Sequence, residues 1–228
     1  MSREAAMHII NNALQQGRKA LSEYESKQVL AAYDIPITRE ILLTDKNQVQ
    51  KAGEEIGYPL VMKGCSAAVA HKTEKGLIHV DIRTDTKALN AFDKIMVGLK
   101  GFDGEVLMQE MVYGKRELVI GLSRDEQFGP CVMFGLGGIF TEILRDISFR
   151  KAPLTRNDAL KMMREIKGHK ILNAIRGMEA ADMELLSNIL INVGRIGLDI
   201  EQVQEIDLNP VILSGTKPIV VDALIILK

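Results

Sequence analysis

The chain ends in short strand-like segments that follow a long helical stretch, and this ending constrains its fold more than any other feature. Residues 202–207, 210–213 and 218–221 are strand-like and come after helical periodicity over 155–197. Strands that close a chain must pair with strands much earlier in the sequence, because a sheet of so few short strands does not bury a core. The segments 116–122 and 130–134 are strand-like and provide such partners. We therefore expect the second half of the chain to form a lobe built on its own sheet.

The first half follows a different pattern. An amphipathic helix is expected over 4–16, and a capping-box sequence begins at Ser22 and ends at Glu25. Strand-like and helix-like segments then alternate, which is typical of a small α/β lobe. The predicted class is α/β (α+β). The predicted domains are an N-terminal helix at 1–20, a small α/β lobe at 21–110 and a larger C-terminal lobe at 111–228.

Composition excludes several classes of protein. The 228 residues are 46% hydrophobic, and 29 basic side chains balance 30 acidic ones, so a nucleic-acid-binding surface is not expected. No apolar run is long enough for a membrane span, and the N-terminus lacks the apolar run of a signal peptide. Two cysteines and four separated histidines match no metal-binding spacing. We expect a cytoplasmic protein that binds neither nucleic acid nor membrane.

Two neighbouring features suggest phosphate chemistry. Lys63 ends an apolar strand, and at the end of a parallel strand its ammonium could reach a ligand crevice. The alternative is a lysine that simply emerges into water. The following loop, 64–76, is rich in small residues and contains His71. Small residues let a backbone approach phosphates, although the Walker A spacing is absent and a lone loop histidine is commonly a surface residue.

The segment QEMVYGKREL, at 109–118, has the features of a nucleotide hinge. Glu110 and Glu117 flank a glycine turn whose free backbone groups could meet an adenine edge, and carboxylates accept hydrogen bonds from amines and ribose hydroxyls. The alternative is an exposed hairpin with ordinary surface acids. Farther on, FGLGGIFTE at 134–142 indicates close approach to a ligand or to another backbone, but does not match the dinucleotide fingerprint.

A late pair of residues could bind a hard cation. Asn209 precedes a proline in EIDLNP, and Asp222 follows the apolar run IVV. A carboxylate and an amide oxygen on adjacent strand ends suit Mg²⁺ when nucleotide phosphates complete the site. The alternative for Asn209 is turn initiation, whereas a carboxylate in an apolar strand needs a partner.

The order of these features resembles the ATP-grasp fold, in which two lobes hold a nucleotide between two β-sheets. The resemblance is closer to one family, the β subunit of ADP-forming acetyl-CoA synthetase, and extends over nearly the whole chain. It rests on LSEYESKQVLAAYDIPIT, HKT, QEMV, FGPCVMFGLGGIFTEILRDISFRKAPL, EIDLNPVIL and VDA, found respectively at 21–38, 71–73, 109–112, 128–154, 205–213 and 221–223. The FGxGGIF and DLNP sequences are specific to that family.

The resemblance implies a role for each candidate residue and implies ATP or ADP with Mg²⁺ as cofactors. His71 would carry the transferred phosphate. The nucleotide phosphates would meet Lys63, with Arg150 and the glycines Gly137 and Gly138 as neighbours. Adenine would be held by Glu110 with the backbone of Met111 and Val112, the ribose by Glu117, and Mg²⁺ by Asn209 and Asp222.

The resemblance also implies a reaction and a partner. The family interconverts acyl-CoA, ADP and phosphate with carboxylate, ATP and CoA, and a separate α subunit carries its CoA-binding and ligase domains. After the histidine the family has H-K-S-D-x-G-G, whereas this chain has His71-Lys72-Thr73-Glu74-Lys75-Gly76-Leu77. The change at Leu77 motivates an alternative function, an ATP-binding regulatory module without phosphate relay. A ligase joining another carboxylate to an amine is disfavoured because no additional substrate domain is visible.

Overall fold

The computed structural model of the chain describes residues 3–68, 76–138, 146–175 and 177–228. These residues form two compact units. Unit 1 comprises Met1–Leu21, Glu25–Ile37 and Val112–Lys228, and unit 2 comprises Ser22–Tyr24 and Thr38–Met111. The units are interleaved along the chain, whereas the predicted domains 1–20, 21–110 and 111–228 are continuous. Those domain bounds therefore remain a prediction.

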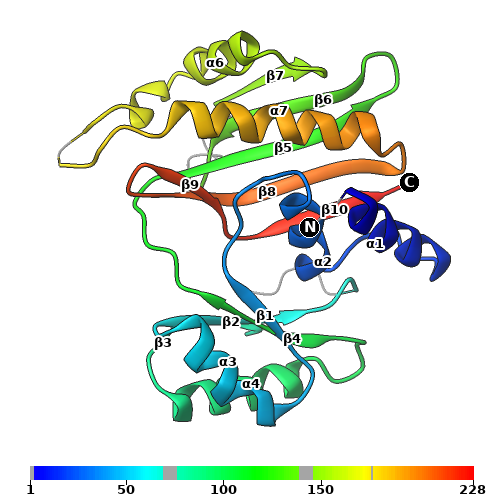
Figure 1. Cartoon of the computed structure of the whole chain (residues 1–228), viewed down its shortest axis with the longest axis vertical. Helices are drawn as coiled ribbons and strands as arrows, with labels where there is room; N and C mark the ends of the chain where they lie inside the picture. Colours follow the sequence, from blue (N-terminus) through cyan, green and yellow to red (C-terminus); the bar gives the residue numbers. More distant parts are fainter. Residues whose placement is uncertain (1–2, 69–75, 139–145, 176) are drawn as a thin grey trace. The chain divides into compact units, whose positions relative to one another are not determined.

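Unit 2 is a four-stranded sheet in the order β1-β4-β2-β3, with every neighbouring pair antiparallel. The helices α3 and α4 lie together against this sheet (Figure 1). Local sequence signals begin two of the helical segments: Asp45 forms a capping box at the 3-10 turn η1 that precedes α3, and Thr84 caps α4 by accepting a hydrogen bond from the backbone of Lys87. The elements are β1 (Glu40–Leu43), η1 (Lys46–Gln48), α3 (Val49–Ile56), β2 (Leu60–Cys65), β3 (Ile78–Ile82), α4 (Asp85–Gly98) and β4 (Glu105–Glu110).

Unit 1 is built on a six-stranded sheet in the order β10-β8-β5-β6-β7, with β9 paired to β8. Its strands are β5 (Glu117–Asp125), β6 (Gly129–Leu136), β7 (Ile147–Lys151), β8 (Val203–Ser214), β9 (Lys217–Val220) and β10 (Ala223–Leu227). The late strand β8 pairs with β5 far back in the sequence, for example Ile206 with Leu122. This long-range pairing confirms the sheet-based lobe expected from the end of the chain.

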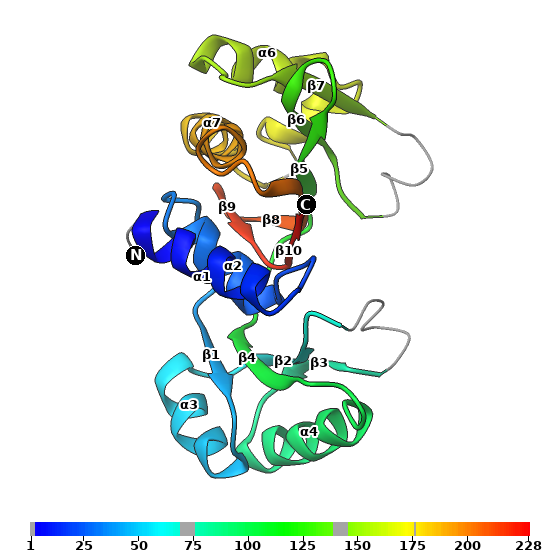
Figure 2. The ribbon, with the colours of Figure 1, turned by 90° about the vertical axis from the view of Figure 1, so that its right-hand side faces the viewer.

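Helices cover one face of the unit 1 sheet, and their apolar sides join its core. The helices are α1 (Arg3–Gln15), α2 (Glu23–Ala31, whose first residues belong to unit 2), α6 (Arg156–Glu165), η2 (His169–Leu172) and α7 (Met183–Asp199). Figure 2 shows α1, α2 and α7 on one side of the strands. Along β7 exposure alternates, so that Ile147 and Phe149 are exposed while Ser148 is buried.

The described helices include none that is long and apolar enough to cross a membrane. Even α7, with 17 residues, alternates buried positions with exposed polar ones.

Candidate functional site

Lys63 is buried, because it lies on β2, whose six residues are all buried. Its Nζ is 2.7 Å from a carboxylate oxygen of Glu23, and the two side chains are 5% and 0% exposed. The strand is central in its sheet, with Leu107 of β4 opposite Lys63 on one side and Ile78 of β3 on the other. The alternative of a lysine emerging into water is therefore wrong. The expected parallel strand is also wrong, because β2 is antiparallel to both neighbours.

Glu23, the partner of Lys63, was not identified as a candidate residue from the sequence. Withdrawing an ammonium from water costs several kcal/mol, which a carboxylate in good geometry can offset. A lysine within a buried strand therefore requires an acid, and that requirement is a usable sequence signal. It does not say which acid, because Glu23 lies 40 positions earlier in the chain.

The hinge glutamate Glu110 ends β4 and is engaged by a neighbour. Its carboxylate accepts hydrogen bonds from the backbone N–H and the Nε of Arg39, at 2.8 Å and 3.0 Å. The next backbone N–H, that of Met111, donates to the carbonyl oxygen of Pro59 at 3.3 Å. A ligand at the hinge would share the Glu110 carboxylate with Arg39. The remaining lone pairs of the carboxylate oxygens, and the backbone groups of Val112, would be available to an adenine edge.

The turn after the hinge is fixed by close packing within unit 1. The buried guanidinium of Arg116 donates to the carbonyl oxygens of Ile171 and Gly215, at 3.1 Å and 2.9 Å. At Gly114 a Cβ atom would lie 2.4 Å from the carbonyl oxygen of Leu213, and a real side chain does not tolerate that distance to backbone. The glycine is therefore required by its contact with β8.

This contact yields a first prediction. Gly114→Ala should force the turn away from Leu213 and should lower the free energy of unfolding by about 1–3 kcal/mol, the usual cost of overpacking. Chemical denaturation of the variant and the original chain measures the change. An unchanged denaturation midpoint would show that the turn moves freely, and the close approach would then have no energetic weight.

The structure brings Glu117 together with Gly137 and Gly138. The N–H of Gly137 donates to the carbonyl oxygen of Glu117 at 2.8 Å. Gly138 has a φ of +65°, and a Cβ there would lie 3.0 Å from the Oε2 of Glu117. The carboxylate thus lies beside a backbone segment without side chains, and such a segment allows a ligand to approach closely.

Arg150 is placed differently. It lies on β7 opposite Val132 of β6, whose side chain is fully buried in the core. Its guanidinium forms an ion pair with Glu165 of α6 and donates to the carbonyl oxygen of Phe149 at 2.7 Å. Arg150 therefore points to the helix-covered side of the sheet. Its role as a phosphate neighbour remains a prediction.

Asn209 and Asp222 lie opposite each other. Leu208 pairs with Ala223 and Val211 with Val220, so Asp222, in the short link between β9 and β10, is level with Asn209 of β8 by count. Residues directly opposite in an antiparallel pair have Cβ atoms about 4.5–5.5 Å apart, so the two side chains can share one ligand. An amide and a carboxylate on adjacent strands are hard oxygen donors of the kind that Mg²⁺ takes.

Asp207 adds to this group, and the sequence analysis missed it. The pKa of its carboxyl is raised by burial and by the nearby carboxylates of Glu205 and Asp222. Period-two alternation along β8 puts Asp207 on the same face as Asn209, and this spacing was a signal available in EIDLNP. A divalent cation would relieve the repulsion among these acids. Within the described residues no three histidines, cysteines or acids are arranged to hold a metal ion by themselves, so bound phosphates would have to complete the coordination.

The candidate residues are distributed over both units. Lys63, Glu110 and Met111 belong to unit 2. Val112, Glu117, Gly137, Gly138, Arg150, Asn209 and Asp222 belong to unit 1. His71 lies outside the described residues.

Comparison with known proteins decides the family. A family model described as an ATP-grasp domain matches residues 12–227. The β subunit of ADP-forming acetate–CoA ligase I of Pyrococcus furiosus is 40% identical over 97% of this chain and 97% of its own length. The chain belongs to the ATP-grasp family of ADP-forming acetate–CoA ligase β subunits. The β subunit of the second such ligase of that organism is 42% identical over 98% of both chains.

Solved structures agree with this assignment. The dinucleotide-forming acetyl-coenzyme A synthetase 1 of Candidatus Korarchaeum cryptofilum, in complex with coenzyme A and Ca-AMPCP, superposes with a TM-score of 0.94 at 41% identity and covers 100% of both chains. Another structure of that synthetase contains Mg-AMPPCP, and its phosphohistidine segment points towards the nucleotide-binding site (TM-score 0.87, 42% identity, 98% of this chain and 100% of that chain). The predicted ATP-grasp fold is thereby confirmed.

Proposed function

We propose that this chain is the nucleotide-binding subunit of an ADP-forming acyl-CoA synthetase. It takes part in the interconversion of acyl-CoA, ADP and phosphate with carboxylate, ATP and CoA. The observation that carries the proposal is the 40% identity to a ligase β subunit along 97% of both chains. The regulatory alternative is not favoured, because the full-length relatives are ligase subunits.

His71 is the proposed phosphate carrier. An imidazole nitrogen attacks the γ-phosphorus of ATP, the bond to the β-phosphate oxygen breaks, and ADP leaves; the reverse transfer makes ATP. Neutral imidazole is a competent nucleophile near pH 7. The Mg-AMPPCP structure of the Korarchaeum synthetase supports this role, because its phosphohistidine segment is directed to the nucleotide.

The nucleotide is proposed to contact Lys63, Glu110, Met111 and Val112, and also Glu117, Gly137, Gly138 and Arg150. Asn209 and Asp222 would hold Mg²⁺, which when bound neutralises charge on the transferring phosphoryl group. The chain contributes the arrangement of these groups. Asn209 and Asp222 would hold the cation at this edge of the sheet, and the nearby acid Asp207 would add to the negative field that attracts it.

A partner subunit is part of the proposal. The relatives from Pyrococcus are β subunits, and an ADP-forming acetate–CoA ligase of Archaeoglobus fulgidus is a single chain, 38% identical, in which the match covers 92% of this chain and 31% of the longer one. We propose that a separate α subunit supplies the CoA-binding and ligase domains.

The test of the proposed function is reconstitution. The chain is mixed with its partner, acetyl-CoA, phosphate and Mg-ADP, and ATP is measured by luciferase. We expect ATP only when both proteins are present. A partner that makes ATP at the same rate without this chain would contradict the proposal.

The cation site gives a second prediction. Asp222→Asn should weaken Mg-ADP binding about 10- to 100-fold, because a charge-assisted contact to the cation is lost. ADP in EDTA should bind both proteins equally. Isothermal calorimetry measures both affinities, and Glu126→Gln, an exposed acid in the turn between β5 and β6, is the matched control. If Asp222→Asn weakened the affinity for ADP equally with Mg²⁺ and in EDTA, Asp222 would contact the nucleotide and not the metal.

A further inference from the structure

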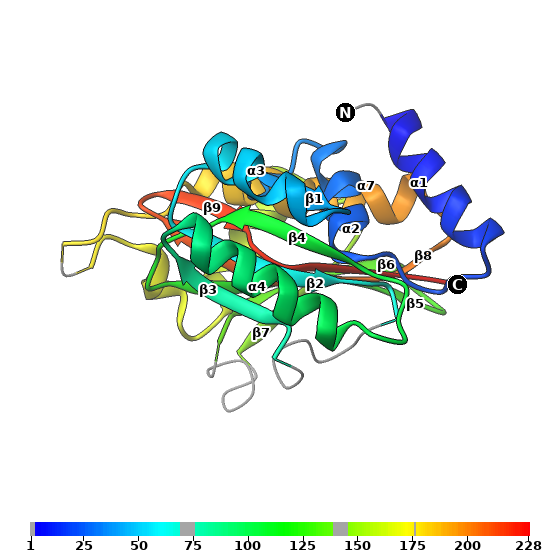
Figure 3. The same cartoon turned by 90° about the horizontal axis from the view of Figure 1, so that it is seen from below.

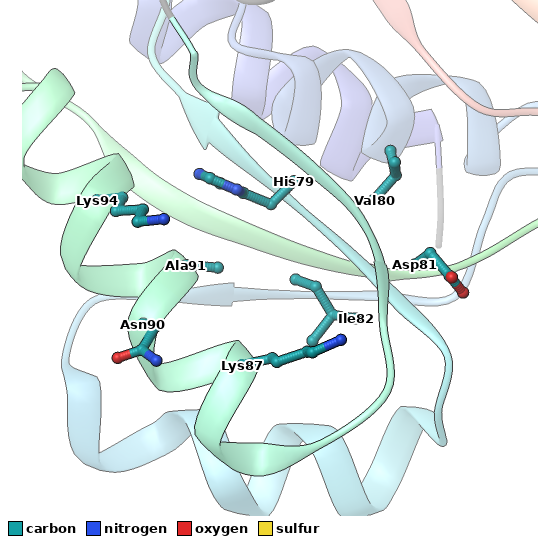
Figure 4. Close-up of a pocket in the computed structure, with 8 residues that line it drawn as sticks. All are labelled: His79, Val80, Asp81, Ile82, Lys87, Asn90, Ala91 and Lys94. Atoms are coloured by element: carbon teal, nitrogen blue, oxygen red, sulfur yellow. The ribbon is translucent and has the colours of Figure 1, made fainter.

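Unit 2 contains a pocket that the nucleotide chemistry does not use. It has a volume of about 260 Å³ and lies between the edge strand β3 and helix α4 (Figure 4). Its lining includes His79 and Asp81 from β3, and Lys87, Asn90 and Lys94 from α4. None of these residues is assigned above to adenine, ribose, phosphate or Mg²⁺.

The helix supplies two cations to this pocket. Lys87 and Lys94 are two turns apart and therefore lie on one face of α4, together with Ala91 between them. In Figure 4 the side chain of Lys94 extends towards the ring of His79, while that of Lys87 extends towards Ile82 at the other end. Figure 3 shows α4 running alongside β3.

The nearby acids already have partners. Asp93 pairs with Lys46 at 2.5 Å, and Asp81 pairs with Arg83 at 2.9 Å. Asp85 accepts the hydroxyl of Tyr58. Within the part of the chain that the structure describes, neither Lys87 nor Lys94 forms an ion pair, so the pocket keeps a net positive charge.

His79 adds an unsatisfied hydrogen-bonding group. Its Nε2 is buried and has no partner among the described residues. Because this atom has no access to solvent, a ligand in the pocket does not contact it, and the ring responds only to charge bound nearby. The pKa of the ring is lowered by burial and by the charge of Lys94, so a positive field acts on the same atom. The ring of His79 therefore lies where a charge bound beside Lys94 would change its pKa.

We propose that this pocket is a second anion site, which takes a small dianionic oxyanion of the phosphate class. Lys94 contacts the anion, Lys87 contributes charge from the far end, and the ring of His79 lies beside the bound anion and reports its charge. Size decides against a nucleotide, because pockets for ligands of that size usually span about 300–1,000 Å³. A divalent cation is excluded by the two ammonium groups.

The site has a defined pH dependence. The groups that face His79 are Lys94 and Lys87 on α4 and Asp81 on its own strand, while Met62 of β2, opposite it, is apolar. A bound anion favours the imidazolium and raises the pKa of His79. By linkage, protonation of His79 tightens the anion by the same factor. Affinity for sulfate, whose charge does not change near neutral pH, should therefore increase as the pH falls through the pKa of His79.

The experiment follows the imidazole resonances of the full chain by NMR during titration with inorganic phosphate. Sodium chloride keeps the ionic strength constant. The chain has four histidines, and His79→Gln assigns the relevant signal. We expect a saturable shift of the His79 signal, and Lys94→Gln should weaken the affinity about tenfold through loss of one charge-assisted contact. Lys51→Gln, an exposed lysine on α3, should leave the affinity unchanged.

Four results would overturn the proposal. The His79 signal could fail to shift saturably, or Lys51→Gln could weaken binding as much as Lys94→Gln, which would indicate general surface charge. Acetate could bind as tightly as phosphate, which contradicts a dianion site. Saturating Mg-ADP could abolish the shift, which would assign it to the nucleotide site. Reconstituted synthetase activity does not depend on any of these outcomes, so the two proposals fail separately.

Discussion

His71→Ala should abolish the acid-labile, base-stable phosphate that Mg-ATP leaves on the chain. Reconstituted ATP synthesis should fall by at least roughly a thousandfold, because removal of the nucleophile removes the covalent intermediate and leaves only binding effects. Labelling with γ-³²P ATP measures the first effect, and luciferase measures the second. Binding of Mg-ADP should persist, because the proposed nucleotide contacts do not include the imidazole.

His8→Ala is the matched control, since His8 is exposed on α1 and belongs to no proposed site. It should retain both the label and the activity. If His71→Ala made ATP at the original rate, the phosphate relay would be wrong although the family assignment would stand. If it lost Mg-ADP binding as well, the histidine would be a nucleotide contact and the loss of label would be secondary.

The altered segment after His71 makes this result informative. Leu77, which replaces a glycine of the family pattern, is fully buried, and its carbonyl oxygen accepts the N–H of Gly64 at 2.8 Å. The substitution thus adds an apolar side chain to the core of unit 2 just before β3 begins. Packing accounts for the leucine, and this weakens the only sequence argument for a chain that has lost phosphate relay.

Local patterns predicted the elements well, because caps and periodicity act over a few residues. The alternation of helix-like and strand-like segments expected in the small lobe is present, and α4, for example, begins with Thr84 as its cap and is followed by β4. Strand direction was not predictable in the same way. All six residues of β2 are buried, which is the pattern typical of a parallel strand, although β2 is antiparallel to both neighbours.

The chemistry of the site was predictable where partners lie on adjacent strands and not where they come from distant segments. The spacing predicted that Asn209 and Asp222 lie near each other, and the register of β8 with β9 and β10 agrees with this; their role as Mg²⁺ ligands stays a prediction. Glu110 was identified without Arg39, which lies 71 positions away, and Lys63 without Glu23. Each missing partner is required by charge, but its identity depends on the fold.

Glu23→Gln should be among the most destabilising single changes in unit 2. Removing one member of a buried ion pair costs about 3–5 kcal/mol, because the remaining charge stays out of water. For a chain of this size that loss lowers Tm by roughly 10 °C. Differential scanning calorimetry measures it. The double variant Glu23→Leu with Lys63→Met should recover most of the stability, because an apolar pair replaces the charges.

Glu25→Gln is the matched control, because Glu25 lies two residues after Glu23 on the same helix and also forms an ion pair. Its ion pair with Arg18 is also 2.7 Å long, but the side chains are 25% and 27% exposed, so the loss should be smaller. A Tm for Glu23→Gln within about 2 °C of the original, on the scale of an exposed pair, would show that the buried pair contributes little.

Mg-ADP separates a structural Lys63 from one that also binds phosphate. If nucleotide phosphates interact with this ammonium, a lysine deprived of its carboxylate gains more from them than a paired one, so Mg-ADP should raise the Tm of Glu23→Gln by more than it raises that of the original chain. In the double variant the extra stabilisation should disappear, because no charge remains at position 63. If Mg-ADP raised the Tm of all three proteins equally, Lys63 would have only a structural role in unit 2. The nucleotide phosphates would then be bound by the other proposed contacts.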